Sequence, residues 1–590
     1  HQGGTGMSEA QSAPPAASPP ASPLGARAAA LVEKVRRAGV AVESPLLVRE
    51  LRTLLRGRKF FVSHIIVLVV LSGVLLIAAT TSAMTGSGDS SAVGTALFWS
   101  FVVGLGTVVI FLVPAFSCTA LTTERESKTL ELLLTTTIRP WEIVWGKLLS
   151  ALVVILLFMV SALPLVTVCF LFGGISPWDL AMLYLGVTFC TMVVSSMSLA
   201  VSAFCRESKS SVVIAYVLTI VFLGLVFFGG AWMVDEFSGS RGLDAFRSWF
   251  SGLPWDEKAM LLIVPQFLGA GAFALNFAAA ANRLKPATVN RTTGVRAIWL
   301  ACLVGAVVLY MLGLHVAIEH SRLGGGDWEA VMILTLSLAA PFLWISALFF
   351  ASDETRLSPR LMEDSERLGG LRLPLRIFMP GPASGLAFVA VCTALLLGGT
   401  GLYATSCAMA FSEGEVGWRY LQAALPAGLF VLTAAGIAAF LSGCGLKRTG
   451  AGFAAFGFSV LLAFGPLIHL GCRQAVAGDD APSTLWNMHY LSPVLAMISG
   501  WAEPGSGRMV TFFAPDEGQL PVPGEGLPLW LVSTAAYALL AMGVWALALT
   551  RIAVTRSRWK AELAAAQAAA RPAAPAGPPA VTGAAGEAQP

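Results

Sequence analysis

Long apolar runs separated by short polar segments dominate the pattern of this chain. Twelve runs contain about twenty residues or more, the length that an α-helix needs to cross the hydrocarbon core of a membrane. The pattern therefore predicts an all-α polytopic helical membrane protein of about twelve transmembrane helices, arranged as six and six. The expected spans are 60–83, 95–121, 148–172, 179–204, 211–234, 259–281, 297–318, 330–351, 383–410, 420–442, 451–471 and 527–550.

Composition supports this class, and the distribution of charge predicts the orientation of the chain in the membrane. Of the 590 residues, 56% are hydrophobic and 12% are charged, about half the charged fraction of a soluble domain. When the segments between spans alternate inside and outside, 31 of the 38 Lys and Arg residues fall on one side. The positive-inside rule makes that side cytoplasmic. We expect a bacterial cytoplasmic (inner) membrane protein with both termini in the cytoplasm. The net charge of +4 follows from this topology and indicates no nucleic acid partner.

The most patterned segment between spans is 121–147, which follows the second span. Thr123 and Glu126 have the spacing of a capping box at the start of a helix. Pro140 ends that helix and suits the first position of the next one, because proline cannot donate to a preceding turn. The sequence thus predicts a short cytoplasmic amphipathic helix whose apolar stripe has no visible core to cover, as expected of a docking surface. The stripe consists of Leu130, Leu133 and Leu134.

A second amphipathic helix is predicted directly before the first span. Ser44 and Pro45 form a helix start, and leucines then recur on one face with arginines on the other. Such a helix is expected to lie at the membrane interface with its arginines on lipid phosphates. A role as a simple anchor for the first span is equally compatible with the pattern. The residues of this interface helix are Arg49, Glu50, Arg52 and Arg56.

Five hydroxyl side chains share one face of the fourth span. Their spacing alternates between three and four residues, which is the period of a helix face. Close helix packing through small residues accounts for such a face. A lining for a transport path is the alternative, and the sequence leaves both open. The residues are Thr188, Thr191, Ser195, Ser198 and Ser202.

The expected spans carry almost no charge, and the chain shows no nucleotide-binding or catalytic pattern. Ion-coupled transporters usually place Asp, Glu or Lys near the middle of the membrane. No G-x-x-x-x-G-K-[ST] motif occurs, and no nucleophile stands beside a base. An outer group of histidine, cysteine and methionine matches no compact metal site, so no metal and no cofactor are expected. That group is His469, Cys472, Met488 and His489.

The two halves of the chain differ in their cytoplasmic segments. The inside loop 352–382 occupies the place that corresponds to 121–147, but it lacks the leucine stripe. The first six residues precede Met7 and are set aside as a tag remnant. The expected organisation is an N-terminal region (1–43), a six-span domain (44–281), a linker (282–296), a second six-span domain (297–551) and a disordered cytoplasmic tail (552–590).

Residues 44–230, about a third of the chain, resemble the membrane subunit of type-2 ATP-binding-cassette (ABC) exporters. The resemblance rests on RELRTLLRGR before the first span and on ERESKTLELLLTTTIRPWEIVWGK between the second and third. It implies that 121–147 contains a coupling helix, that the helix before the first span is the connecting helix, and that a separate cytoplasmic ATPase binds ATP and Mg. The implied ATPase-contact residues are Glu124, Glu126, Thr129, Glu131, Leu132 and Leu133, and those that set the entry angle of the third span are Trp141, Gly146 and Lys147.

The resulting hypothesis is a permease subunit of an ATP-driven exporter, with no enzymatic activity of its own. An uncharged path favours an amphipathic or lipid-linked substrate. A dimer of permeases is expected, as a homodimer or a heterodimer, because two ATPases need two docking segments and this chain shows one. The homodimer is preferred, and a pseudo-dimer formed by the two halves of one chain is the alternative that the sequence leaves open. A secondary transporter or channel without an ATPase and a non-transporting membrane scaffold are the alternatives. A membrane-embedded enzyme is the least supported reading.

Overall fold

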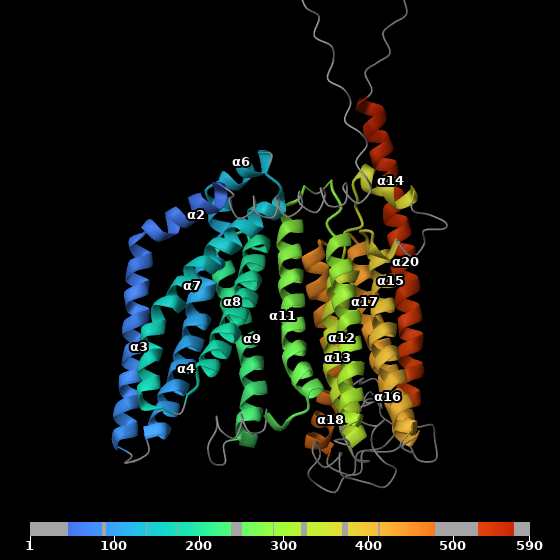
Figure 1. Ribbon diagram of the computed structural model, residues 1–590. Coiled ribbons are helices and arrows are strands. Elements are labelled where there is room, and N and C mark those ends of the chain that lie inside the picture. The colour runs from blue at the N-terminus through green and yellow to red at the C-terminus, as the bar shows by residue number, and fades with distance from the viewer. Residues whose placement is uncertain are drawn as a thin grey trace, which may run out of the picture. The chain divides into compact units, whose positions relative to one another are not determined.

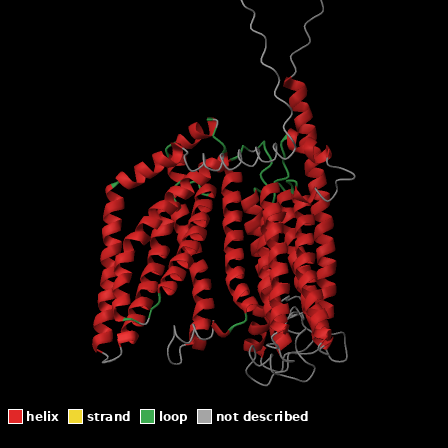
Figure 2. Ribbon diagram, viewed as in Figure 1, coloured by secondary structure: helices red, strands yellow, loops and turns green. Residues whose placement is uncertain are grey.

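The structure of this protein is a computed structural model, and its described part is built from helices. Within that part no strand occurs (Figures 1 and 2), which confirms the predicted all-α membrane class. The described residues are 45–84, 90–136, 138–173, 175–237, 251–286, 288–319, 327–367, 376–410, 414–477 and 529–570.

Each expected span overlaps a described helix. Nine helical segments among the described residues are long and apolar enough to cross a membrane. These nine coincide with nine of the expected spans. Shorter apolar helical stretches coincide with the remaining three, at Ser208–Gly224, Thr335–Ala351 and Arg448–Phe464.

The chain packs as two compact units, each described here by itself. Unit 1 contains the chain up to Thr191 together with Glu207–Val212, and unit 2 contains Met192–Arg206 and the chain from Val213 onward. The two units are defined by which residues pack together, and this does not test the domain boundaries expected from the sequence. Those boundaries stay predictions.

Unit 1 contains the amphipathic helix before the first span, the first three spans, the short cytoplasmic helices between the second and third spans, and the first half of the fourth span. Its centre is apolar: Phe101 and Val166 are fully buried, and Leu71 is almost so. Many apolar side chains of its outer surface, such as Ile65 and Val69, stay exposed, as expected where lipid replaces water. Its long helices are α3 (Arg58–Met84), α4 (Ser90–Ser117), α7 (Pro140–Phe172) and the first part of α8 (Pro177–Phe204).

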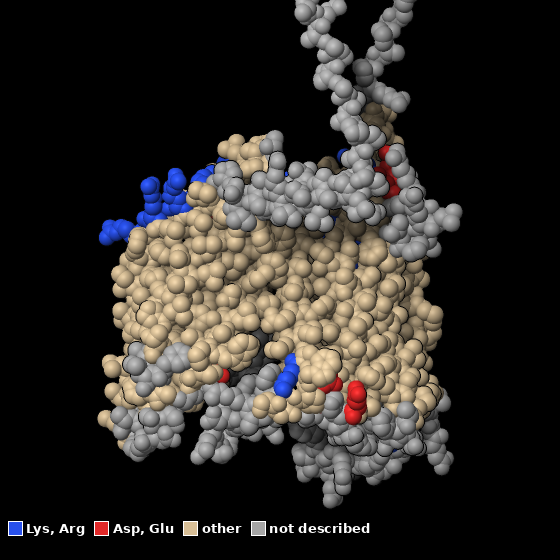
Figure 3. Space-filling view, viewed as in Figure 1, with Lys and Arg blue, Asp and Glu red and all other residues tan. Residues whose placement is uncertain are grey.

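Helix α2 (Pro45–Arg56) precedes α3 and has the predicted amphipathic form. Leu54 and Leu55 pack on a cluster around Phe158, so protein and not lipid covers this part of its apolar face. The opposite face is exposed, and basic side chains gather over it (Figure 3). The exposed arginines of α2 are Arg49, Arg52 and Arg56.

Unit 2 contains the remaining spans. Small residues line the contacts of α17 with its neighbours: Ala434, Ala435 and Ala438 are buried, and a Cβ at Gly436 would lie 2.8 Å from the Trp545 ring. Helix axes therefore approach closely, as is usual for membrane helices. The helices are α9 (Ser208–Phe237), which begins in unit 1, α11 (Trp255–Leu284), α12 (Thr293–Glu319), α13 (Asp327–Ala351), α14 (Pro359–Arg367), α15 (Pro382–Thr393), α16 (Gly399–Ala410), α17 (Gly414–Gly443), α18 (Arg448–Ala477) and α20 (Leu529–Ala570).

The expected span 383–410 is not one regular α-helix. A π-helical segment, η2 (Ala394–Gly398), joins α15 to α16. The Tyr420 hydroxyl reaches the Leu397 carbonyl oxygen at 3.4 Å and the Thr400 hydroxyl at 3.3 Å. A side chain that hydrogen-bonds to a helix carbonyl oxygen, in place of a backbone N–H, is a known cause of a helix irregularity. The hydropathy of the sequence alone does not predict such a contact.

The expectation of a disordered tail over 552–590 is wrong for its first part. Helix α20 continues to Ala570, twenty residues past the end of the expected span 527–550. The sequence AELAAAQAAA explains this continuation, because alanine, glutamate and leucine have high intrinsic helix propensity. The predictions for residues 1–44 and 571–590 and for most of the outer loop 472–526 lie outside the described residues, and so do Met488 and His489.

Candidate coupling site

The segment between α4 and α7 folds as two short helices and not as the single helix expected from its sequence. These are α5 (Thr122–Glu126) and α6 (Thr129–Thr135). Lys128 separates them in the left-handed conformation, at φ +59°. The Ser127 hydroxyl donates to the Thr123 carbonyl oxygen at 2.9 Å, which also accepts the Ser127 N–H, and it lies 2.9 Å from the Thr129 hydroxyl. The side chain of Ser127 thus connects the end of α5 to the start of α6.

The predicted capping box of Thr123 and Glu126 is wrong. No side chain caps α5, and the Thr123 hydroxyl donates to the Thr119 carbonyl oxygen at 2.7 Å. The chain enters α5 from a turn in which the Thr123 N–H already donates to Thr119. An N–H group that has a backbone acceptor needs no side-chain cap.

Glu126 instead caps another helix. Its carboxylate accepts the N–H of Ser208, the first residue of α9, at 2.7 Å. A negative charge at a helix N-terminus satisfies an orphan N–H and faces the positive end of the helix dipole. The Ser208 hydroxyl donates to Thr122 at 3.0 Å, and the Ser211 hydroxyl donates to the Cys118 carbonyl oxygen at 2.6 Å. Helix α5 is therefore tied to the first turn of α9.

Lys147 joins α5 to the two helices beside it. This side chain lies on α7 with 4% of its surface exposed, and its Nζ is 2.8 Å from Glu124 Oε1 and 3.4 Å from Glu50 Oε1. Glu124 belongs to α5 and Glu50 to α2, with 16% and 18% of their side-chain surfaces exposed. One largely buried ammonium group thus links three helices, and we call Glu50, Glu124 and Lys147 the coupling triad.

Helix α6 projects from this base and exposes apolar surface. Leu130 turns inward and is buried, whereas Leu132 is 70% exposed and Leu134 is also exposed. The leucine stripe predicted from the sequence is thus divided between the interior and the surface. Glu131, Thr129 and Glu126 are exposed as well, and Leu133 is half-buried. Figure 1 shows α6 and α2 at the same end of unit 1.

A side-chain hydrogen bond closes the first turn of α7. The Arg139 N–H donates to Glu142 Oε2 at 3.1 Å, which caps the first turn. Trp141 is exposed beside it, whereas Gly146 and Lys147 are buried. The ATPase contact of the residues named above and the angle-setting role of Trp141, Gly146 and Lys147 stay predictions.

The hydroxyl face of α8 lies largely inside the protein. Thr188 is half-buried, and its hydroxyl donates to the Tyr184 carbonyl oxygen at 2.7 Å. Thr191 donates to Thr188 in the same way. Ser195, Ser198 and Ser202 are completely buried. Helix packing accounts for this placement, and the path-lining role stays a prediction.

Sequence reasoning missed a buried ion pair in unit 2. Arg296 on α12 is completely buried and lies 2.6 Å from Asp353, just after α13. Its guanidinium also donates at 2.7 Å to each of the carbonyl oxygens of Ile377 and Met379. Arg296 appears in the sequence as one more basic residue of an inside segment. Its partners lie more than fifty residues away, so no local pattern marks it.

Comparison with known proteins identifies one of these regions. Residues 45–240 match the family model of ABC-2 family transporter proteins, and this range contains α2, the coupling triad and both helices of the projecting segment. The comparisons with curated proteins and with solved structures found no significant match. The resemblance noted from the sequence is thereby confirmed. Over residues 45–240 this chain is therefore similar to the ABC-2 family transporter proteins, a family of membrane permease components of ABC transporters.

Proposed function

We propose that this chain is the permease of an ATP-driven exporter and that a separate cytoplasmic ATPase docks on α6. The observation that carries this proposal is the exposed Leu132 on a short helix whose base is fixed by buried polar contacts. Exposed leucines on a rigid helix suit insertion into a groove of a partner. The partner would bind ATP and Mg, because no phosphate-binding loop occurs in this sequence.

The coupling triad supports a route by which movement of the ATPase reaches the membrane. A displacement of α6 moves α5, to which it is joined by a single turn. Glu124 then carries the displacement to Lys147 on α7, and through Lys147 to Glu50 on α2. Glu126 carries it to the first turn of α9. Such rigid-body shifts of packed helices are an established mode of conformational switching.

The other parts of the proposal concern cargo, assembly and location. The low charge of the spans supports an amphipathic or lipid-linked substrate. The family match covers one region of the chain, which supports a second copy or a related permease as the other half of the transporter. The distribution of Lys and Arg supports a bacterial inner membrane protein with cytoplasmic termini.

Leu132→Asp tests the docking surface directly. This side chain is 70% exposed, so the substitution leaves the fold intact but places a charge where an apolar groove must close. Burying an unpaired carboxylate costs on the order of several kcal/mol. We therefore expect co-purification of the ATPase with the affinity-tagged permease, and export by cells, to be lost in this variant.

Leu446→Asp is the matched control, because Leu446 is an exposed leucine in a different inside loop. It should retain the ATPase and its transport activity. If Leu132→Asp keeps both, or if no ATPase accompanies the wild-type chain, the proposed docking site is wrong. A secondary transporter or a scaffold then becomes the better explanation.

A further inference from the structure

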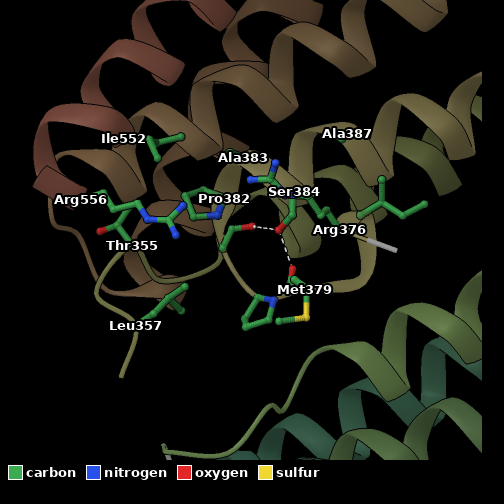
Figure 4. Close-up of a pocket in the computed structure, with 13 residues that line it drawn as sticks. Thr355, Leu357, Arg376, Met379, Pro382, Ala383, Ser384, Ala387, Ile552 and Arg556 are labelled. Atoms are coloured by element: carbon green, nitrogen blue, oxygen red, sulfur yellow. Dashed lines mark hydrogen bonds between the residues drawn. The ribbon is translucent and has the colours of Figure 1, made fainter. Parts of the chain in front are cut away.

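Unit 2 contains a cavity of about 500 Å³ that the coupling mechanism does not use. It lies where the inside loop around Thr355 and the turn before α15 meet α20, and thirteen residues line it (Figure 4). In Figure 4 Arg556 stands beside Thr355, and Arg376 stands beside Ser384. The residues that line it belong to the end of unit 2 from which α14 and the last part of α20 project (Figure 1).

The lining of this cavity combines two guanidinium groups with an apolar wall. Arg376 and Arg556 are the charged residues among the thirteen, and no Asp or Glu is among them. The wall consists mostly of apolar side chains, which include Leu357, Met379 and Ile552. Guanidinium groups bind phosphate oxygens in a fork geometry, and an apolar wall suits hydrocarbon. The lining therefore matches a ligand that is anionic at one end and apolar at the other.

The floor of the cavity is held in place before any ligand arrives. Arg296 donates to the carbonyl oxygen of Met379 at 2.7 Å and to the Ser384 hydroxyl at 3.2 Å. Gly381, the residue before α15, has φ +130°, a conformation that favours glycine. Pro382 begins α15 and has no N–H, so the N–H groups of Ala383 and Ser384, which no side chain caps, provide the positive end of the helix dipole at the floor.

The position of the cavity indicates the source of the ligand. Pro382 begins the helical segment Pro382–Cys407, which is long and apolar enough to span a membrane, and we infer from this that the floor lies near the boundary of the hydrocarbon region. The inside loops here belong to the side rich in Lys and Arg. Lipid headgroups occupy this level, and basic pockets between membrane helices are suited to bind them.

We propose that this cavity binds the phosphate headgroup of an anionic phospholipid between Arg376 and Arg556. The part of an acyl chain nearest the headgroup then lies along Ala387 and Ile552. This site belongs to unit 2 and is independent of the proposed ATPase docking on α6.

The test uses the full chain purified in a neutral detergent. Phosphatidylglycerol is titrated in, and lipid retained on the protein is measured by native mass spectrometry, with phosphatidylcholine as the neutral comparison. We expect the double variant R376Q/R556Q to bind phosphatidylglycerol at least about tenfold more weakly than the wild type, because each arginine near an anionic lipid contributes to the attraction. A387F should also bind more weakly, because its ring fills the apolar part from an exposed position and leaves both arginines in place.

R558Q is the matched control, because Arg558 is an exposed arginine of α20 that does not line the cavity. It should bind phosphatidylglycerol within about twofold of the wild type, as expected for an arginine outside the site. Inorganic phosphate at millimolar concentration should not displace the lipid. The proposal is overturned if phosphatidylcholine binds equally well, if R558Q loses as much binding as the double variant, or if inorganic phosphate displaces the lipid and thereby identifies a free anion as the ligand.

Discussion

Lys147→Met is expected to lower the free energy of unfolding by about 3 kcal/mol and to abolish transport. The substitution leaves Glu124 without its cation, and the second oxygen of that carboxylate is already buried without a hydrogen-bond partner in the described chain. Breaking a buried ion pair costs about 3–5 kcal/mol, and the partial exposure of both glutamates places this case at the low end. Thermal unfolding of the purified chain in detergent measures the loss.

A second variant separates stability from coupling. In Lys147→Met, Glu50 still has the Arg49 guanidinium at 3.6 Å as an ion-pair partner. Glu124 is therefore the carboxylate that the substitution leaves without its cation. The double variant with Lys147→Met and Glu124→Gln should regain most of the lost stability, because no unpaired charge remains. It should still fail to transport, because α2, α5 and α7 are no longer linked. Recovery of transport in the double variant would show that the triad is structural only. Lys447→Met, at an exposed position between α17 and α18, serves as the Lys→Met control.

Arg296→Met is expected to have the larger effect on folding, about 5 kcal/mol. Arg296 is completely buried, and its loss leaves Asp353 Oδ2 and the Ile377 carbonyl oxygen without this donor. Arg448 still lies 3.3 Å from Asp353 Oδ1, and the Ser384 hydroxyl still donates to the Met379 carbonyl oxygen. A buried acceptor without a donor and a buried carboxylate that loses its nearer cation each carry a large desolvation penalty. We expect little folded protein on size-exclusion chromatography in detergent and a much lower unfolding temperature for what remains.

Two related variants make that prediction specific. Arg448 also contacts Asp353, at 3.3 Å, but it is 33% exposed, so Arg448→Met should cost only about 1 kcal/mol. Arg296→Lys keeps the charge but cannot reproduce the set of directed N–H bonds, so its stability should lie between the wild type and Arg296→Met. If Arg296→Met and Arg448→Met have equal effects, the buried network does not hold this end of unit 2 together.

The spans and the projecting segment could be predicted because their signals are local. Twenty apolar residues in a row indicate a span whatever they pack against, and the amphipathic pattern of 45–56 gave α2 correctly. The residues of the coupling triad were all named, but their association was not. Glu50 and Lys147 are 97 positions apart, and charge patterns along one helix contain no information about such a pair.

Other features depend on contacts that no local rule contains. Thr123 and Glu126 have the correct spacing for a capping box, yet the turn before α5 already satisfies the N–H of Thr123. Glu126 is thereby free of that role and caps α9, which begins 82 residues later. The η2 segment depends in the same way on Tyr420 of the following helix. Tertiary contacts override local patterns at these positions.

Site-specific photo-crosslinking from position 132 tests the docking of an ATPase on α6 most directly. A photoreactive amino acid replaces Leu132 in the full chain, and adducts formed in cells are identified by mass spectrometry, with the same amino acid at exposed position 446 as the control. We predict an adduct at 132, absent at 446, with a soluble protein that carries the phosphate-binding loop of a cassette ATPase. The absence of such an adduct at 132, or an equal yield at 446, would contradict the account.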